Sequence, residues 1–418
     1  MDILLKSATI FDPSSPYHLQ KLDLLIQQGN ISQIDQNLKC PDHCKEIQLD
    51  DLTVSPGWFD ASVIFGEPGF EDRETLCHGL KVAAKSGFTK VAINSNGSPL
   101  TDHKTTVNYL KSQGFGTGVD VFPIGSLTKK SKGEDIAELY DMQQAGAIAF
   151  NDYKKATNNP NLTKIALQYA QSFGGLVMSY PNTQNITGNG IVNEGSHSTQ
   201  LGLKGIPSIS EELQISRDLF LLEYTGGKLH IPTISTQKSV DLIRAAKAKG
   251  FNITCSVSAH HLTLTDQELF SFDANYKMVP PLRTQEDTQA LIQGVKDNTI
   301  DFITSDHCPI DIENKKIEFS NALDGAIGLE SLFTSLMTVL DLPTVIQKLT
   351  TDVHKVFGLT APTIDLHSKA NLSLFTTESN GVFLEEHILS SSKNSPYLGK
   401  PTQGKVFGSY HQGLLNLA

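Results

Sequence analysis

Two aspartates stand where apolar runs of the sequence end, and their positions suggest a reactive site. Asp152 follows the run AIAF and Asp306 follows DFITS. In a barrel of parallel strands the reactive groups lie at the carboxyl ends of the strands, so we expect both carboxylates at one mouth. A two-metal hydrolytic site would need about five or six ligands, mostly His and carboxylate. Two carboxylates without imidazoles would suit a hard cation such as magnesium better than zinc.

Three histidines and one cysteine lie close to these strand ends, and we assign structural roles to them. His260 and His261 are neighbours. Adjacent residues of a strand face opposite sides of the sheet, so these two cannot point at one metal without distortion. His307 follows Asp306 directly and meets the same objection. Cys308 would need a base within reach to act as a nucleophile, and a buried, inert thiol is the simpler interpretation.

The composition excludes several classes of protein. A formal net charge of −11 over 418 residues argues against a nucleic-acid partner, because phosphate binding needs a basic face. Five cysteines make no disulfide framework, and Cys40 and Cys44, which flank His43, lack a second cluster that would complete a zinc site. The first residues carry no basic segment leading into an apolar one, and nowhere do 18 apolar residues run together. We therefore expect a cytoplasmic protein without membrane contact.

Through the middle of the chain the hydrophobic pattern alternates between strands and helices. Thr284, with Asp287 three residues later, predicts the start of one of the helices. Eight such strand–helix units predict an α/β protein with a (β/α)8 TIM barrel over residues 55–363. The alternative, a doubly wound sheet, typically has a glycine-rich phosphate-binding loop after its first strand. The segment GEPGF does not have that pattern. The eight predicted strands lie in TVSPGWFDASVIF, FTKVAINS, GVDVFPIGS, AIAFND, GGLVMSY, KLHIPTIS, NITCSVSAHHL and DFITSD.

The two ends of the chain carry short strands separated by turn residues instead. These are LLKSATIF, LDLLIQ and ISQID at the start, and NLSLFTT, GKVFGSYHQG and LLNLA at the end. Neither end can close a core alone, so each needs a partner. We therefore predict one composite β-sandwich domain, built from residues 1–54 and 364–418.

Blocks spread along nearly the whole chain resemble the dihydroorotase family of cyclic amidohydrolases. They are SPGWFDASVIFGEPG, GFTKVAINSNGSP, NEGSHSTQLGLKGIPSISEE, HIPTIST, SAHHLTLTD, PPLR, SDHCPI, EFSNALDGAIGLE and SSKNSPYLGKPTQGKV. The resemblance implies the same barrel with a small β-sandwich from both chain ends. It also implies one or two zinc ions that activate water to open dihydroorotate to carbamoyl aspartate, or the reverse.

The departures from the family pattern fall on its metal ligands. The family's His-x-His corresponds to Ser62 and Ile64, and its two later histidine ligands correspond to Ser179 and Thr233. The double aspartate after the fourth strand survives as Asp152 alone, followed by Tyr153, whereas Asp306 matches the catalytic aspartate. Among the substrate-binding groups Asn96 remains, but Gly66, Val279 and Ile310 stand in place of an arginine, an asparagine and a histidine.

These departures lead us to expect that Asp306 and Asn96 are vestigial and that the chain uses no zinc or other cofactor. Small neutral residues at the vacated positions avoid burying unpaired charge. Asp306 then lacks its metal. We expect hydroxyls, His or water to satisfy its carboxylate, or its pKa to be raised.

Three functions stay open at this point. The first is a non-catalytic dihydroorotase-like protein that supports the assembly of aspartate carbamoyltransferase in pyrimidine synthesis, as the degenerate members of the family do. The second is an active dihydroorotase, or a related cyclic amidohydrolase, with a metal held by Asp306, Asp152 and other ligands. The third is a binding module for an orotate-like small molecule, using Asn96 and Arg283. The resemblance also favours a homodimer.

Overall fold

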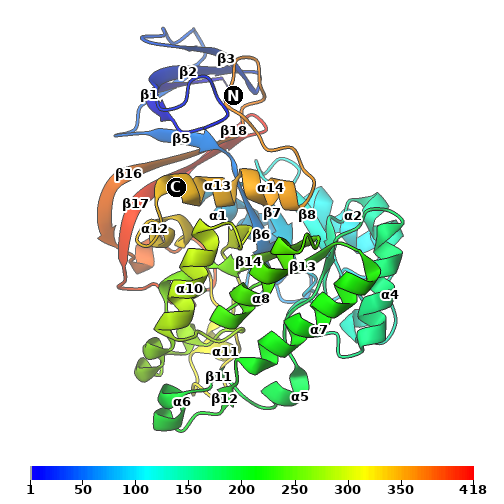
Figure 1. Ribbon diagram of the computed structural model, residues 1–418. Helices are drawn as coiled ribbons and strands as arrows, with labels where there is room; N and C mark the ends of the chain where they lie inside the picture. Colours follow the sequence, from blue (N-terminus) through cyan, green and yellow to red (C-terminus); the bar gives the residue numbers. More distant parts are fainter. Residues whose placement is uncertain (1) are drawn as a thin grey trace.

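Strands from both ends of the chain pair in one eight-stranded sheet, drawn in blue and in orange to red in Figure 1. The computed structural model describes residues 2–418. The sheet has the order β18-β17-β16-β5-β1-β2-β3, and β4 pairs with β1. An antiparallel register that places Val54 of β5 opposite Leu374 of β16 joins the two ends. The strands are β1 (Ile3–Ile10), β2 (Lys21–Gln27), β3 (Asn30–Asp35), β4 (Lys45–Ile47), β5 (Thr53–Pro56), β16 (Leu372–Val382), β17 (Pro401–His411) and β18 (Leu414–Leu417). The short strands predicted at both ends are present, while domain limits at residues 54 and 364 stay a prediction.

Eight parallel strands form the barrel, in the order β15-β14-β13-β10-β9-β8-β7-β6. The barrel closes between its last and first strands, because Val63 pairs with His307 in a parallel bridge and the Ile64 amide donates to the His307 carbonyl at 2.9 Å. Their burial on both faces explains why these strands read as continuous apolar runs. The strands are β6 (Trp58–Val63), β7 (Phe88–Ile93), β8 (Asp120–Gly125), β9 (Ala149–Phe150), β10 (Val177–Met178), β13 (Leu229–Ile231), β14 (Ile253–Ser258) and β15 (Phe302–Thr304). The predicted fold class is confirmed.

Helices cover the outside of the barrel, as Figure 1 shows for α4, α7, α8 and α10. The predicted start at Thr284 is confirmed, because Thr284 and Asp287 form a reciprocal capping box. The longer helices are α1 (Leu76–Lys85), α2 (Lys104–Gln113), α3 (Leu139–Ala145), α4 (Pro160–Gln171), α7 (Ile209–Thr225), α8 (Gln237–Ala248), α10 (Gln285–Lys296), α13 (Leu342–Leu349) and α14 (Thr351–Val356). The short elements are α5 (Gln184–Thr187), β11 (Val192–Asn193), α6 (Ser196–Leu201), β12 (Gly205–Ile206), α9 (Ala259–Thr263), α11 (Ile312–Lys315) and α12 (Leu332–Leu336).

The connection between β16 and β17 leaves the end sheet and lies on the barrel. In this segment, residues 383–400, the Ser391 amide donates to Glu74 at 2.8 Å, and the Asn394 side chain donates to the Cys308 carbonyl at 3.0 Å. Tyr397 is buried in the same cluster as residues of the barrel loops. The C-terminal part of the chain therefore completes the barrel as well as the end sheet.

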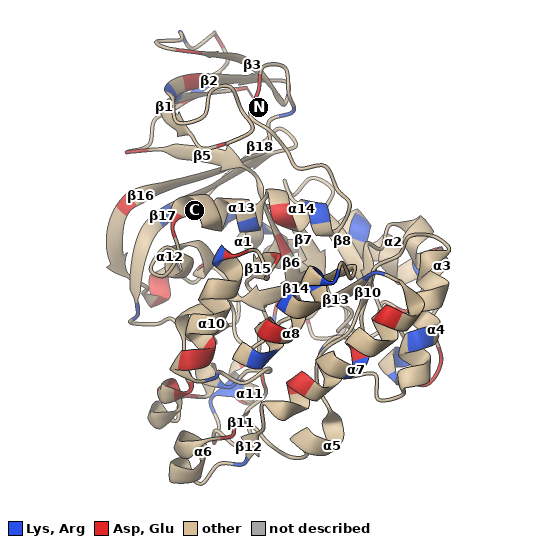
Figure 2. Ribbon diagram, viewed as in Figure 1, with Lys and Arg blue, Asp and Glu red and all other residues tan. Residues whose placement is uncertain are grey.

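The described surface carries both signs of charge. Figure 2 shows acidic and basic residues interspersed along the helices. Within residues 2–418, no helix combines the length and apolar character needed to cross a membrane. Cys40 and Cys44 are free thiols, and the Cys40 thiol donates to the Cys44 carbonyl at 3.3 Å.

Candidate functional site at the barrel mouth

Asp306, just beyond the carboxyl end of β15, is the centre of a small polar cluster. Its Oδ2 accepts from the Lys154 ammonium at 2.9 Å, while its Oδ1 lies 3.4 Å from Ser62 Oγ and 3.5 Å from the Tyr153 hydroxyl. The Asn94 amide donates to Ser62 Oγ at 3.1 Å. Side-chain exposure is 4% for Asp306 and 17% for Lys154. A largely buried ion pair therefore occupies the mouth of the barrel.

The backbone around this ion pair departs from ordinary loop conformations. Lys154, Thr233 and Asp306 have φ angles of 52°, 52° and 49°. Left-handed backbone costs a residue with a side chain roughly 1–2 kcal/mol, so packing rather than local preference specifies these turns. The three residues follow β9, β13 and β15. Such strained positions gather at functional sites more often than elsewhere.

Burial and the neighbouring cation act on the Asp306 carboxyl in opposite directions. Burial raises the pKa of Asp306, and the Lys154 ammonium limits that rise. At Asp60, two residues before Ser62 in β6, burial raises the pKa to about 7, against hydrogen bonds from Ser305 and Ser62 that lower it. The Lys154 ammonium thus favours the charged form of the Asp306 carboxyl, whereas its burial favours the neutral form.

Two of the predicted metal positions form hydrogen bonds with partners other than Asp306. Asp152 accepts from the Thr128 amide at 3.0 Å and from its hydroxyl at 2.5 Å, and it does not line the cavity beside the ion pair. Burial raises the pKa of Asp152. Ser179 donates to Asp218 of α7 at 2.6 Å. Thr128 therefore holds the Asp152 carboxylate, and a metal site shared by Asp152 and Asp306 stays a prediction.

The other predicted positions also have local roles. Ile64 packs with Cys308 and Ile310 in a small apolar cluster. Thr233 lines the cavity beside Lys154. Asn96 is half-buried in the loop after β7 and does not line that cavity. Ser62, Thr233 and Asp306 therefore meet at the mouth, whereas Ile64 and Asn96 do not join them.

Arg283 is committed to the protein itself. Its Nε donates to Ser235 Oγ at 3.0 Å, and one terminal nitrogen donates to the Asn193 side chain at 2.8 Å and to the Ile206 carbonyl at 2.9 Å. The other terminal nitrogen lies 3.9 Å from Glu211. This buried guanidinium, with several hydrogen bonds, therefore connects the segments that contain Asn193, Ile206 and Ser235. The geometry gives no support to a ligand-binding role for it.

Burial favours the neutral form of His260, His261 and His307, the three histidines near the predicted strand ends. His261 pairs with Ser258 Oγ at 2.7 Å and with the Pro280 carbonyl at 3.1 Å, and burial lowers its pKa to about 4. Burial lowers the pKa of His260 and His307 to about 3. The argument that His260 and His261 lie on a strand is wrong, because β14 ends at Ser258 and both lie in the short helix α9. Cys308 is buried and burial raises the pKa of its thiol.

A cavity of about 10 Å³ remains beside the ion pair. Ligand pockets typically measure about 300–1,000 Å³, so this space would hold one water molecule at most. Lys154, Asn94 and Tyr180 line it, and none of them was foreseen from the sequence. The sequence did contain an indication of Lys154. A lysine two residues after Asp152 follows the end of a predicted strand, and Asp306, at the end of another, needs a positive partner.

Solved structures show which class of fold this is. L-hydantoinase from Arthrobacter aurescens superposes with a TM-score of 0.83 at 20% identity, covering 99% of this chain and 95% of that one. D-hydantoinase from a Thermus species gives a TM-score of 0.83 at 22% identity, with the same coverage. At this identity the likeness shows the fold alone, a barrel of eight parallel strands beside a sheet built from both ends of the chain.

Sequence comparison narrows the class to a family. Residues 52–239 match the family model described as dihydro-orotase-like. A protein of Geobacter metallireducens named dihydroorotase is 36% identical over 410 residues, 97% of this chain and 96% of its own. Its namesake in Geotalea daltonii is 38% identical with the same coverage. The chain belongs to the dihydroorotase family of pyrimidine biosynthesis.

The zinc that the family resemblance implies does not fit the residues at this mouth. Zinc is held by thiolate, imidazole and carboxylate groups, usually with at least three protein ligands. Within residues 2–418, no three His, Cys, Asp or Glu side chains converge on one point. The Lys154 ammonium donates to the Asp306 carboxylate and would repel a metal cation there.

Proposed function

We propose that this chain is a dihydroorotase-like protein of pyrimidine biosynthesis that has lost the histidine metal ligands and is non-catalytic. The observation that carries the proposal is the ion pair of Lys154 and Asp306 at the barrel mouth, with an N–O distance of 2.9 Å. A protonated lysine there supplies one positive charge to a carboxylate that would otherwise need a metal. The fold is thereby kept without the cation.

The same geometry argues against hydrolysis. A metal-dependent hydrolase lowers the pKa of a bound water to about 7, and an ammonium ion cannot coordinate water in that way. Ser62, Thr233 and Asn94 surround the ion pair with neutral groups. A dihydroorotate ring has no room in the 10 Å³ cavity beside them.

We further propose that the protein acts as a structural partner of aspartate carbamoyltransferase. Helix α7 supports a role in assembly, because it presents apolar side chains to solvent along one stripe. Phe220 is 73% and Tyr224 75% exposed, and Ile209 and Leu213 continue the stripe towards the start of the helix. Large exposed apolar side chains in a contiguous row are typical of protein–protein contact surfaces. A second copy of this chain, as in the expected homodimer, is the competing occupant.

The relatives named dihydroorotase favour the alternative of an active enzyme. Two measurements on the purified protein separate the alternatives: its zinc content, and its turnover of dihydroorotate and of carbamoyl aspartate with and without added zinc. We expect sub-stoichiometric zinc and no turnover, with the Geobacter sulfurreducens relative, named dihydroorotase, as the comparison enzyme. Turnover that disappears in Asp306→Asn would overturn the non-catalytic proposal.

Assembly is tested by co-expression with the transferase of the same cell. We expect a joint complex by size-exclusion chromatography with light scattering, and its loss in the double variant Phe220→Glu, Tyr224→Glu. The exposed apolar residues Phe115 and Ile312, which lie outside α7, changed to glutamate give a control with the same change in charge. A transferase that keeps its free size beside this chain would refute the partner role.

A further inference from the structure

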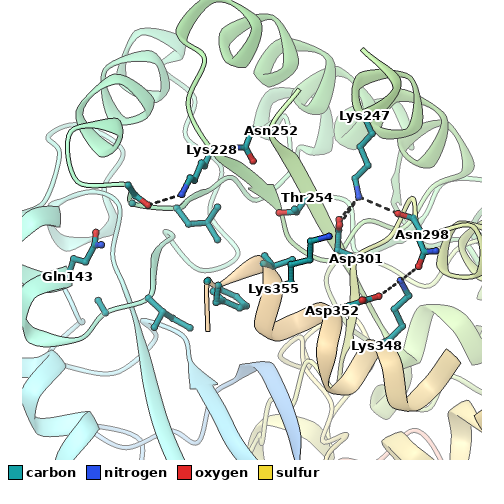
Figure 3. A pocket seen from close by; sticks show the side chains of 18 of the residues that line it. Gln143, Lys228, Lys247, Asn252, Thr254, Asn298, Asp301, Lys348, Asp352 and Lys355 are labelled. Atoms are coloured by element: carbon teal, nitrogen blue, oxygen red, sulfur yellow. Dashed lines mark hydrogen bonds and ion pairs between the residues drawn. The ribbon is translucent and has the colours of Figure 1, made fainter. Parts of the chain in front are cut away.

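A hollow of about 840 Å³ opens at the end of the barrel opposite to Asp306. Its walls come from residues that precede strands β9, β10, β13, β14 and β15, together with α13 and α14 (Figure 3). The amino ends of parallel strands share one face of a barrel, and the Asp306 site lies at the other face. This hollow is therefore separate from the barrel mouth.

Two ion pairs form a fixed wall of the hollow. Lys247 Nζ lies 2.7 Å from both carboxylate oxygens of Asp301, and Lys348 Nζ lies 2.8 Å from Asp352. Asn298 connects the pairs, since its carbonyl accepts from Lys247 at 3.4 Å and its Oδ1 accepts from Lys348 at 2.8 Å. The Lys348 side chain is only 1% exposed. Figure 3 shows this chain of contacts along one side of the hollow. Both aspartates are thus already neutralised.

Two further lysines enter the same hollow without a carboxylate partner. Lys228 lies at the start of β13, and its ammonium reaches the Gly174 carbonyl at 3.4 Å. Lys355 enters from α14, as Figure 3 shows. Within the described residues 2–418, neither forms an ion pair. Four lysines and two aspartates line the hollow, which gives it a formal charge of +2 in a chain of −11.

The remaining wall suits the organic part of a ligand. Ile148, Leu176 and Phe357 give an apolar side. Asn252 adds an amide side chain that can bind hydroxyls or a ring edge, whereas the amide nitrogen of Gln347 already donates to Asp352 at 3.1 Å. The volume lies within the range typical of small-molecule sites, about 300–1,000 Å³. A ligand with a doubly negative end, and a small body that carries both hydroxyl groups and an apolar face, would match this lining.

We propose that the hollow binds a small phosphorylated metabolite, with its phosphate dianion between Lys228 and Lys355 and its organic part against Leu176 and Phe357. Lysine is a common phosphate binder that acts as a point charge. Two such charges match a phosphate monoester dianion, whereas the paired Lys247 and Lys348 hold the wall in place. The proposal does not depend on whether the Asp306 end is catalytic.

Calorimetric titration of the full chain with ribose 5-phosphate tests this proposal, with inorganic phosphate, succinate and ribose as comparison probes. We expect ribose 5-phosphate to bind, and the double variant Lys228→Gln, Lys355→Gln to weaken that binding by at least about tenfold. Both lysines are exposed at their ends, so the variant should fold. The matched control is Lys81→Gln, Lys104→Gln, which removes the same charge from exposed positions on α1 and α2. Its affinity for ribose 5-phosphate should equal that of the wild type.

Several results would overturn the proposal. One is no binding of ribose 5-phosphate, and another is equal weakening in the control variant, which would mean attraction to overall charge. Equal affinity for inorganic phosphate would remove the role of the apolar wall. Tighter binding of succinate would assign the hollow to dicarboxylates instead.

Discussion

Replacing Lys154 by methionine should destabilise the barrel in a pH-dependent way. The change leaves the Asp306 carboxylate, 4% exposed, without its cation. Removing one partner of a buried ion pair costs about 3–5 kcal/mol, and we expect the lower end, about 3 kcal/mol at about pH 8, because Lys154 is 17% exposed.

The pH dependence follows from proton linkage at Asp306. Burial already raises the pKa of this carboxyl, and without the ammonium it rises further above the unfolded value of about 3.9. The native state then binds more protons than the unfolded chain, so its stability falls as the pH rises through the native pKa. The deficit of Lys154→Met against wild type should therefore be largest at about pH 8 and shrink towards about pH 5.

The assay is urea unfolding followed by the fluorescence of Trp58. This is the single tryptophan of the chain, and it is buried in β6. Adding Asp306→Asn to the variant removes the unpaired charge and should restore stability to within about 1 kcal/mol. The control is Arg244→Met, which breaks exposed pairs with Asp241 and Asp297 and should lower the free energy of unfolding by about 1 kcal/mol or less. A pH-independent deficit, or no rescue by Asp306→Asn, would refute the idea that Lys154 exists to neutralise Asp306.

Three further changes test other parts of the structure by the same unfolding assay. Ser179→Ala removes the 2.6 Å hydrogen bond to buried Asp218 and should lower the free energy of unfolding by about 1–2 kcal/mol. An unchanged free energy of unfolding would mean that water replaces the hydroxyl. Gly57→Ala places a methyl group against the side chains of Asn371 and Thr89. It should lower the free energy of unfolding by about 1–3 kcal/mol through overpacking, so an unchanged unfolding midpoint would contradict the close approach. Thr284→Ala removes the cap of α10 and should cost about 1 kcal/mol, while Thr284→Ser should keep it.

The sequence was sufficient for the fold because its hydrophobic pattern is long and regular. Eight buried runs with helices between them leave few topologies, and the blocks that resemble the family agree with that pattern. Short elements were harder to predict. AIAFND forms a strand of two residues, Ala149–Phe150, and SAHHL turns into α9 after Ser258. Patterns of four or five residues cannot distinguish a strand from a single helical turn.

The site was harder to predict, because its contacts depend on the direction in which each side chain points and not only on where the residue lies in the sequence. Asp152 and Lys154 are two residues apart, yet one bonds to Thr128 and the other to Asp306. The left-handed backbone at Lys154 changes the course of the chain after β9. Lysine has no preference for this conformation, so the sequence does not predict it. Residue types alone showed that Asp306 would need a partner. Which side chain supplies it depends on how the loop folds.

The pairing of the two chain ends has a consequence for how the protein is made. The Trp58 amide bonds to the Ser373 hydroxyl, 315 positions later, and Ser391 bonds to Glu74, 317 positions away. Contacts between such distant residues form late and slow the folding of a chain. A ribosome must therefore release nearly the whole polypeptide before β5 meets β16 or the barrel receives Tyr397. Until then the apolar residues of β5 that pair with β16 are uncovered, and exposed apolar strands in such partly folded chains are prone to aggregate.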